Sequence, residues 1–534
     1  MRPGNRPPPE TTAARSDGRD PVRHERNTEN ETTHLRPNNI AKQTTILTLT
    51  LSLLSSVQLW AKDYRVSDFG AVADGTTLNT RALQRAIDVI HEEGGGKLIF
   101  PLGRYVSGTL HLLSGVTLHL ESGAVLLGST NPFDYVKDPY VRWMAMVFAM
   151  KQENIGITGK GTIDGQGFKT ANNMVQYIQR GIYEDPLKLD RPNETNRPEN
   201  IYFRECTNVT ITGITLRDPA SWNQTYDQCK NVYVDDIYVE ANSYWNNDDI
   251  VDCDGVVIKN SFFNAADDVL CFKSHDANSI CQNVVVDNCV GRSGANGLKF
   301  GTVSRGGFRN FKVTNITIYD TYRSAITFAA VDGGLIDNIL VDGVRSINTG
   351  NVIFLRIGDR WGKGKQPSMK NVTIQNVYAE VPLRKPDAGY NYEGPIEDMP
   401  RNISPASIVG LPDYPIENIT LKNITMVYPG GGNKLFAYRG LTPAELDGIP
   451  EMRDTYPEFS QFKELPAWGF YIRHAKGITF DNVKFIAEKP GDYRPGLVTD
   501  DVQGLTLRKV EFEEPGANGK EQVFTYKTTG IVKE

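Results

Sequence analysis

Four neighbouring segments of the chain share one pattern, in which a cysteine and two variable residues precede a strand-like run of alternating apolar and polar residues. The cysteines are Cys206, Cys229, Cys253 and Cys281, which stand 23, 24 and 28 residues apart. Repetition at this period indicates a solenoid, because each unit buries its apolar face only against the next unit. The units hold short strand patterns without a helix, which predicts an all-β, right-handed parallel β-helix.

The same pattern continues towards the C-terminus, so one solenoid accounts for most of the 534 residues. A solenoid grows by adding coils to one elongated core. We therefore predict a single β-helix domain over residues 62–534, with its longest interruptions at residues 380–418 and 428–477. The later units begin at Asn310, Asn371, Asn418, Gly477 and Gly504.

The N-terminal region differs in composition from the rest of the chain. Residues 1–43 are rich in Pro, Arg, Asn and Thr and poor in large apolar residues, which predicts a disordered or wrongly assigned extension. Residues 44–61 form a short, mostly apolar stretch after Lys42, as secretory signal peptides do. A membrane span needs about 20 apolar residues, and a single anchor is the alternative. We expect a secreted or periplasmic protein without a membrane span in its mature form.

The charge of the chain limits its partners. The 58 Lys and Arg residues and 64 Asp and Glu residues leave a net charge of −6 at pH 7. This balance lacks the basic character of nucleic-acid-binding proteins, so we expect no nucleic-acid partner. An anionic polysaccharide remains compatible, because one site can be locally basic. The sequence predicts no particular oligomeric state.

The six cysteines allow a disulfide framework or a row of small apolar side chains. Four of them recur at one position of successive coils, where parallel stacked side chains fit the disulfide dihedral poorly. No Cys-x-x-Cys or His pair indicates a metal site. We predict buried, free cysteines. The asparagines of several Asn-x-Thr/Ser sequences resemble glycosylation sites but are expected to turn the chain between strands; they are Asn208, Asn315, Asn371, Asn418 and Asn423.

Two acidic pairs stand about one coil apart. Asp267 and Asp268 follow the third repeat, and Asp248 and Asp249 precede them by 19 residues. Residues one coil apart lie above one another in a solenoid, so we expect these acids on one face. Crowded carboxylates keep one group protonated while another stays ionised, which is what hydrolysis of a glycosidic bond requires. Adjacent aspartates also occur in solvated turns, so the interpretation depends on both pairs together.

At these residues the chain resembles glycoside hydrolase family 28, the polygalacturonases and their bacterial exo-acting relatives. The resemblance covers nearly all of residues 63–515, including the segments DYRVSDFGAVADG and TIDGQG, which many carbohydrate-active β-helices share. The family's Asn-Thr-Asp-Gly-x-Asp motif is matched by residues 246–249, and its paired aspartates by Asp267 and Asp268. The resemblance implies hydrolysis with inversion and without a cofactor, in which Asp267 donates the proton while Asp248 and Asp268 hold and deprotonate water.

The chain departs from the family pattern at three places. Asp249 replaces the motif's glycine. An alignment without gaps instead puts Asp249 on the motif's last aspartate and leaves Asn246 at the catalytic one, so whether Asp248 or Asp249 is the third acid stays open. The family's Gly-His-Gly is replaced by Ala295-Asn296-Gly297. The Arg-Ile-Lys that holds a galacturonate carboxylate should fall within residues 324–334, which contain no base.

Other residues can bind the substrate in place of this clamp, since a sugar carboxylate is held best by Arg or Lys. For each cation the alternative is a surface charge. Nearby aromatic residues, Trp222, Tyr244 and Trp245, can stack on sugars or pack against the solenoid. The segment Tyr471–His474 is expected in a loop that closes one end of the site. The predicted substrate-binding residues are Asn247, Lys273, Asn296, Lys299, Arg323 and Arg356.

Together these features predict an inverting glycoside hydrolase that attacks a pectic, galacturonic-acid-containing polysaccharide or oligosaccharide, in an exo manner. Two alternatives remain open. A β-helix polysaccharide lyase could bind Ca²⁺ through the clustered acids, and it would form unsaturated, ultraviolet-absorbing products. A non-catalytic carbohydrate-binding solenoid is favoured by the missing histidine and clamp, and it would bind sugar without cleaving it.

Overall fold

The computed structural model describes residues 62–185, 192–241, 248–361, 365–384, 386, 404–436 and 439–534, and for residues 248–251 it describes the backbone alone. The predicted extension (1–43), the predicted signal peptide (44–61) and Asn247 lie outside these ranges, as do Tyr244 and Trp245. None of the helices in the described ranges has the length and apolar character needed to cross a membrane.

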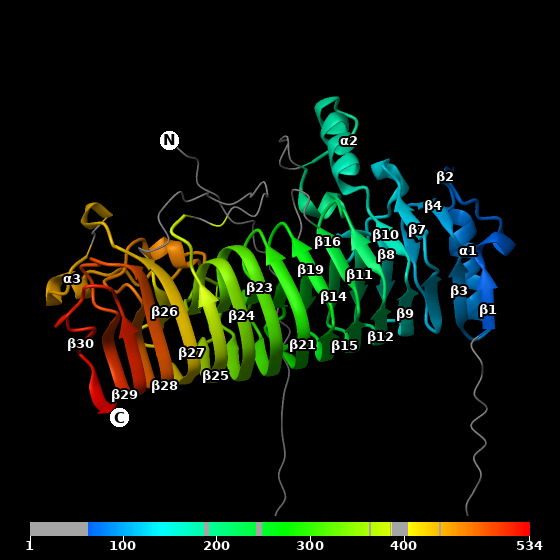
Figure 1. The fold of residues 1–534 in the computed structure, drawn as a ribbon. Helices are drawn as coiled ribbons and strands as arrows, with labels where there is room; N and C mark the ends of the chain where they lie inside the picture. Colours follow the sequence, from blue (N-terminus) through cyan, green and yellow to red (C-terminus); the bar gives the residue numbers. More distant parts are fainter. Residues whose placement is uncertain are drawn as a thin grey trace, which may run out of the picture. The chain divides into compact units, whose positions relative to one another are not determined.

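The described chain winds into successive coils that stack on one another, each coil adding a strand to three parallel ladders (Figure 1). This architecture confirms the predicted all-β, right-handed parallel β-helix. The first ladder, which carries the candidate site, contains in order β5 (Leu110–His111), β8 (Met144–Met150), β11 (Pro198–Arg204), β14 (Gln224–Asp227), β17 (Asp248–Val251), β20 (Leu270–Ser274), β22 (Leu298–Ser304), the ends of β23 (Gly307–Ala330) and β24 (Leu335–Ile357), β26 (Ala406–Val409), the beginnings of β28 (Phe470–Lys489) and β29 (Leu497–Glu513), and β30 (Val523–Tyr526).

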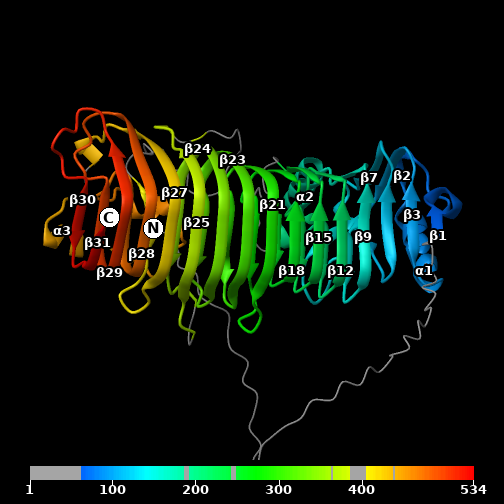
Figure 2. The same ribbon diagram turned by 60° about the horizontal axis from the view of Figure 1, so that its bottom comes forward.

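The other two ladders complete each coil, and Figure 2 shows many strands of the second ladder side by side. The second ladder contains β1 (Lys62–Arg65), β3 (Gly96–Phe100), β6 (Val116–Leu120), β9 (Glu153–Gly159), β12 (Thr207–Thr212), β15 (Lys230–Asp235), β18 (Asp254–Lys259), parts of β21 (Cys281–Ser293), β23, β24, β25 (Ser368–Glu380), β27 (Ile416–Gly430), β28 and β29, and β31 (Thr529–Lys533). The third contains β2 (Asp74–Leu78), β4 (Gly103–Ser107), β7 (Ala124–Gly128), β10 (Thr162–Asp164), β13 (Thr215–Arg217), β16 (Tyr238–Ala241), β19 (Phe262–Ala265) and the remaining parts of the long strands.

Helices lie outside the coils. The amphipathic helix α1 (Thr80–Glu92) buries Leu83, Ile87 and Ile90 against the first coils, so it covers the apolar end of the stack. Helix α2 (Gly167–Gln179) follows β10 and projects away from the coils in Figure 1. Helix α3 (Pro443–Asp447) belongs to residues 431–469, which connect β27 to β28 and are called the insertion below. The short 3-10 helices are η1 (Val66–Phe69), η2 (Pro132–Asp134), η3 (Glu194–Asn196), η5 (Lys434–Phe436) and η6 (Phe459–Phe462).

The core fills the space between the ladders, because every second side chain of a strand points inward. Beneath the candidate site the inward positions of three successive coils are Phe272, Phe300 and Phe328. The Phe300 ring centroid lies 5.4 Å from that of Phe272 and 4.3 Å from that of Phe328. These rings support the strands whose outward residues form the site.

The repeated cysteines and asparagines behave as predicted. All six cysteines are free and buried. The five asparagines of the Asn-x-Thr/Ser sequences have positive φ angles of 52–57°, a region that asparagine tolerates in turns. Their side chains also connect neighbouring coils: the amide of Asn231, for example, donates to Asn208 at 3.0 Å. The asparagines therefore turn the chain at coil corners.

We expect Phe300→Ala to lower the free energy of unfolding by about 3–5 kcal/mol, because the lost ring leaves a cavity between two other phenylalanines. Urea unfolding followed by circular dichroism measures the change. The matched control is Tyr238→Ala, whose ring is 45% exposed and whose loss should cost about 1 kcal/mol or less. Equal effects of the two substitutions would contradict the assignment of Phe300 to the core beneath the site.

Candidate active site

The candidate site lies on the outer face of the first ladder, opposite the phenylalanine stack. Backbone pairing aligns Asp249 with Cys271, and Cys271 with Lys299. Asp248 stands one residue before Asp249 and therefore outside this row. We call these aligned positions the outer row; its members are Thr225, Asp249, Cys271, Lys299 and Thr327.

Asp268, which precedes β20, is a buried and fully engaged carboxylate. It is 1% exposed. Its Oδ2 accepts a hydrogen bond from Lys299 Nζ at 2.6 Å, and its Oδ1 accepts from the backbone N and Nδ2 of Asn296 at 3.0 and 2.7 Å. Burial alone would raise its pKa, but the charges of Lys299, Arg323 and Lys273 hold the pKa of Asp268 below its usual value. Asp268 is therefore ionised at neutral pH.

Asp267 differs from its neighbour, since it is partly exposed to solvent. Burial and the charge of Asp268 raise the pKa of Asp267 to about 7, against the opposing effect of Lys299, Arg323 and Lys273. Like charges side by side cannot both ionise easily. The two aspartates are therefore split into one protonated and one ionised group at neutral pH, the combination that general acid catalysis needs.

Two cations next to the acids are tied to the insertion. The Nζ of Lys299 donates to the hydroxyl of Tyr456 at 2.9 Å as well as to Asp268. Arg323 pairs with Glu458, with 2.6 Å between Nε and Oε1. The sequence analysis did not select Tyr456 or Glu458, because the insertion lacks the repeat pattern that locates the other residues. The insertion thus completes the surroundings of the acid pair from far along the chain.

Lys273 and Asn296 also lie at the site. The Nζ of Lys273 donates to the carbonyl of Thr302 at 3.1 Å and lies 5.0 Å from the ring centroid of Trp222. Asn296, at the family's histidine position, bonds to Asp268 and accepts from the Thr327 hydroxyl at 2.9 Å. Asn296 therefore fixes the orientation of Asp268. The structure brings together Asp267, Asp268, Lys273, Asn296, Lys299 and Arg323.

Arg356 is placed elsewhere. It pairs in the first ladder with Ala329 and Val409, and it is 2% exposed. Its guanidinium donates to backbone carbonyls, including that of Met452 at 3.0 Å and that of Glu451. These contacts give Arg356 a structural role, in which it holds the insertion on the outer face of the ladder.

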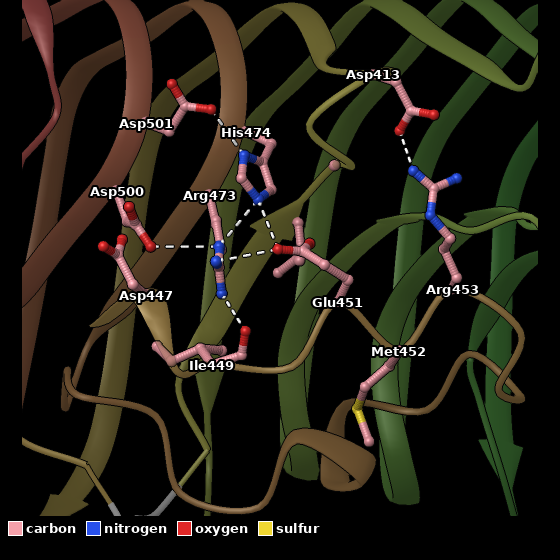
Figure 3. A network of polar contacts seen from close by, with 12 residues as sticks. Asp413, Asp447, Ile449, Glu451, Met452, Arg453, Arg473, His474, Asp500 and Asp501 are labelled. Atoms are coloured by element: carbon pink, nitrogen blue, oxygen red, sulfur yellow. Dashed lines mark hydrogen bonds and ion pairs between the residues drawn. The ribbon is translucent and has the colours of Figure 1, made fainter. Parts of the chain in front are cut away.

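Arg473 and His474 hold the same segment of the insertion (Figure 3). Arg473 donates to the carbonyl of Ile449 at 2.6 Å and pairs with Glu451 at 3.0 Å. His474 lies between two carboxylates, with Nδ1 2.7 Å from Asp501 and Nε2 3.1 Å from Glu451. The expectation that residues 471–474 form a loop is wrong, because they belong to β28. The loop beside the acids is the insertion that they anchor.

The described residues contain no group of three or more His, Cys, Asp or Glu side chains arranged to hold a metal ion. The side chains of Asp248 and Asp249 lie outside this description. Among the residues described, the functional groups near Asp267 are carboxylates, cations, a phenol and an indole. Such groups can transfer a proton to a leaving oxygen and bind an anionic sugar.

A sequence model of glycosyl hydrolases family 28 matches residues 99–345. The exo-poly-α-D-galacturonosidase of Dickeya chrysanthemi is 26% identical over 437 residues, which cover 68% of this chain and 71% of that protein. A family 28 exopolygalacturonase from Yersinia enterocolitica has a similar structure, with 22% identity, a TM-score of 0.55 and coverage of 88% of this chain and 78% of that one. A hyperthermoactive exopolygalacturonase from Thermotoga maritima is 21% identical and has a TM-score of 0.54. The matched part covers 69% of this chain and 87% of that one. The structural likenesses show a shared fold.

The raised pKa of Asp267 predicts a stability cost at high pH. The folded chain keeps the proton up to about pH 7, whereas the unfolded chain releases it near pH 4. The cost therefore grows as the pH rises from about 4 through 7 and is constant above. We expect Asp267→Asn, which cannot ionise, to raise the free energy of unfolding by about 1–3 kcal/mol at pH 8 and by much less at pH 4. Urea unfolding at both pH values measures this, with Asp63→Asn on exposed β1 as the control. Equal stability of Asp267→Asn and the parent at pH 8 would contradict the raised pKa.

Proposed function

We propose that this glycoside hydrolase, whose residues 99–345 match the sequence model of glycosyl hydrolases family 28, acts on a pectic, galacturonic-acid-containing polysaccharide or oligosaccharide and cleaves it from a chain end with inversion. The observation that carries the proposal is the acid pair, in which Asp267 holds a proton to about pH 7 while Asp268 stays ionised among cations. Hydrolysis of a glycosidic bond needs one protonated and one ionised carboxyl group.

In the proposed mechanism, Asp267 donates its proton to the leaving glycosidic oxygen. Asp268 already accepts three hydrogen bonds and is 1% exposed, so we assign it to holding Asp267 protonated rather than to activating water. The acid on β17 then deprotonates the water that attacks the opposite face of the sugar. We propose Asp249 for this role, because it shares the outer row with Lys299.

The substrate class follows from the charges around the acids. Lys273, Lys299 and Arg323 all act on Asp267 electrostatically, so an anionic sugar is attracted to this surface. Thr327 aligns with Lys299 on the next coil, and Phe328 and Ala329 follow it. None of these three side chains carries a positive charge, so they cannot replace the family's Arg-Ile-Lys clamp. We propose that these cations attract the sugar carboxylate through the positive potential that they create, since Lys299 is 1% exposed and is already bonded to Asp268 and Tyr456. The similar enzyme from Dickeya chrysanthemi is named for action on galacturonosides.

Attack at chain ends is supported by the insertion. Tyr456 and Glu458 lie against the cations that surround the acid pair. Their segment is fixed to the ladder by Arg356 and Arg473, so it stays beside the site. A fixed obstruction next to the scissile bond admits the end of a chain better than its middle.

We propose that residues 62–534 form one catalytic domain and that residues 44–61 direct its export to the periplasm or the outside of the cell. The support is the apolar stretch after Lys42 and the repeat that continues through the chain. Pectic polymers of plant cell walls lie outside the cell that degrades them, which fits an exported enzyme.

We expect the purified protein to release reducing ends from de-esterified polygalacturonan, with a rate that falls as the pH rises through about 7, because Asp267 then loses its proton. Asp267→Asn should lower the rate by about 10³-fold. Asp268→Asn should move the alkaline limb to lower pH, because it removes the charge that raises the pKa of Asp267. Reducing-end assays over pH 4–9 measure these effects. Unsaturated products absorbing in the ultraviolet would instead indicate a lyase, and no cleavage of any galacturonide would reject the proposed substrate.

The register makes a separate prediction for the third acid. Asp249→Asn should lower the rate of hydrolysis by about 10²-fold or more, whereas Asp248→Asn should keep it within about tenfold of the parent. The two substitutions are adjacent and equal in size, so each controls for the other. Initial rates on trigalacturonate, together with circular dichroism to confirm folding, make the comparison. The opposite ranking would assign the role to Asp248 and support the gapped alignment.

A further inference from the structure

An aromatic and cationic surface continues from the acid pair along the outer face. Trp361 is 51% exposed and Tyr456 is 39% exposed. The Cζ of Arg360 lies 3.8 Å from the ring centroid of Trp361 and 5.7 Å from that of Tyr456. Since Tyr456 also bonds to Lys299, Arg360 and Tyr456 connect Trp361 to Lys299, the partner of Asp268.

Arg360 acts as a fixed support for Trp361. Its Nε and Nη2 donate to the two carboxylate oxygens of Asp332 at 3.0 and 3.4 Å. The Asp332 side chain is buried, and it also accepts from the backbone N of Ser304 at 3.0 Å. The charge of Arg360 is thereby matched, and its flat guanidinium is held in place beneath the indole ring. The exposed face of Trp361 is therefore ordered before any ligand binds.

Arg305 supplies a second positive charge near Trp361. Its side chain is exposed, and its Cζ lies 5.8 Å from the Trp361 ring centroid. Within the described part of the chain, its guanidinium makes no ion pair or hydrogen bond. An exposed guanidinium beside an ordered indole matches a pyranose that carries a carboxylate, because the ring presents an apolar face and the acid a bidentate acceptor.

We propose that Trp361 and Arg305 form a subsite for an anionic sugar residue beside the one that is cleaved, with the sugar ring on Trp361 and its carboxylate on Arg305. The inference rests on the proposed function for the identity of the sugar, a galacturonate. Trp361 and Arg305 stand outside the positions of the family's carboxylate clamp, so other residues than the clamp provide the specificity for an anionic sugar. The subsite also explains why Arg360 pairs with Asp332 whereas Arg305 has no acidic partner among the described residues.

The test measures the binding of trigalacturonate and digalacturonate by calorimetry, using the full chain with Asp267→Asn so that the ligand is not cleaved. Adding Arg305→Gln should weaken trimer binding about fivefold and reduce its salt dependence. Adding Trp361→Ala should weaken it about threefold to tenfold, and Trp361→Phe should restore most of the loss. Binding of the dimer should change less if the dimer fails to reach the subsite.

The matched controls are Arg345→Gln and Tyr378→Ala. Arg345 lies 5.4 Å from the Tyr378 ring centroid, so this exposed pair repeats the cation–aromatic geometry on the third ladder, away from the acids. Neither control should change trimer binding. Equal effects of the control and test variants would overturn the subsite.

The wild-type protein separates this inference from the proposed function. If wild type cleaves trigalacturonate but Arg305→Gln and Trp361→Ala leave its KM and trimer affinity unchanged, the subsite is wrong and the function stands. If wild type cleaves no galacturonide yet binds the trimer in a manner that depends on Arg305 and Trp361, the function fails and the subsite stands. If no galacturonide binds, both are rejected.

Discussion

Backbone hydrogen bonds between successive coils hold neighbouring strands of the first ladder about 4.8 Å apart and in register. This spacing aligns Asp249, Cys271 and Lys299 although they are 22 and 28 residues apart in the chain. The aromatic stack of Phe272, Phe300 and Phe328 supports the same strands from inside. The position of a functional side chain therefore depends on its coil and on the parity of its place in the strand, and a shift of one residue would turn it into the core.

The buried ion pair between Lys299 and Asp268 determines the chemistry of the acids. Two charges removed from water are costly unless they are paired and hydrogen-bonded, and Asn296 supplies the additional bonds. Burial raises the pKa of Asp267, and the negative charge of Asp268, which is held ionised, raises it further. A protonated group close to neutral pH is thus obtained at a cost in stability, as is common where function needs a perturbed pKa. The family's histidine is not needed for this arrangement.

The insertion connects the site to the rest of the molecule. Arg356 and Arg473 bind its backbone carbonyls, and Glu451 lies between Arg473 and His474. These anchors belong to β24 and β28 of the first ladder, so the ladder that carries the acids also carries the supports of the segment that borders them. Within the insertion, Tyr456 contacts both Lys299 and Arg360 of the first-ladder coils. A rigid support of this kind suits a site that must recognise the end of a chain.

The repeat of cysteines, apolar residues and asparagines by itself determined the β-helix, the free cysteines and the turning asparagines, because each depends on local alternation and stacking. The sequence also selected Asp267, Asp268, Lys273, Asn296, Lys299 and Arg323, which lie together in the structure. Three features became visible in the folded chain alone: Tyr456 and Glu458 complete the site, Arg356 supports the insertion, and Asp249 stands in the outer row. The physical reason is that a non-repeating segment more than 150 residues from the acids has no periodicity that fixes its place, so its position depends on long-range contacts with buried arginines.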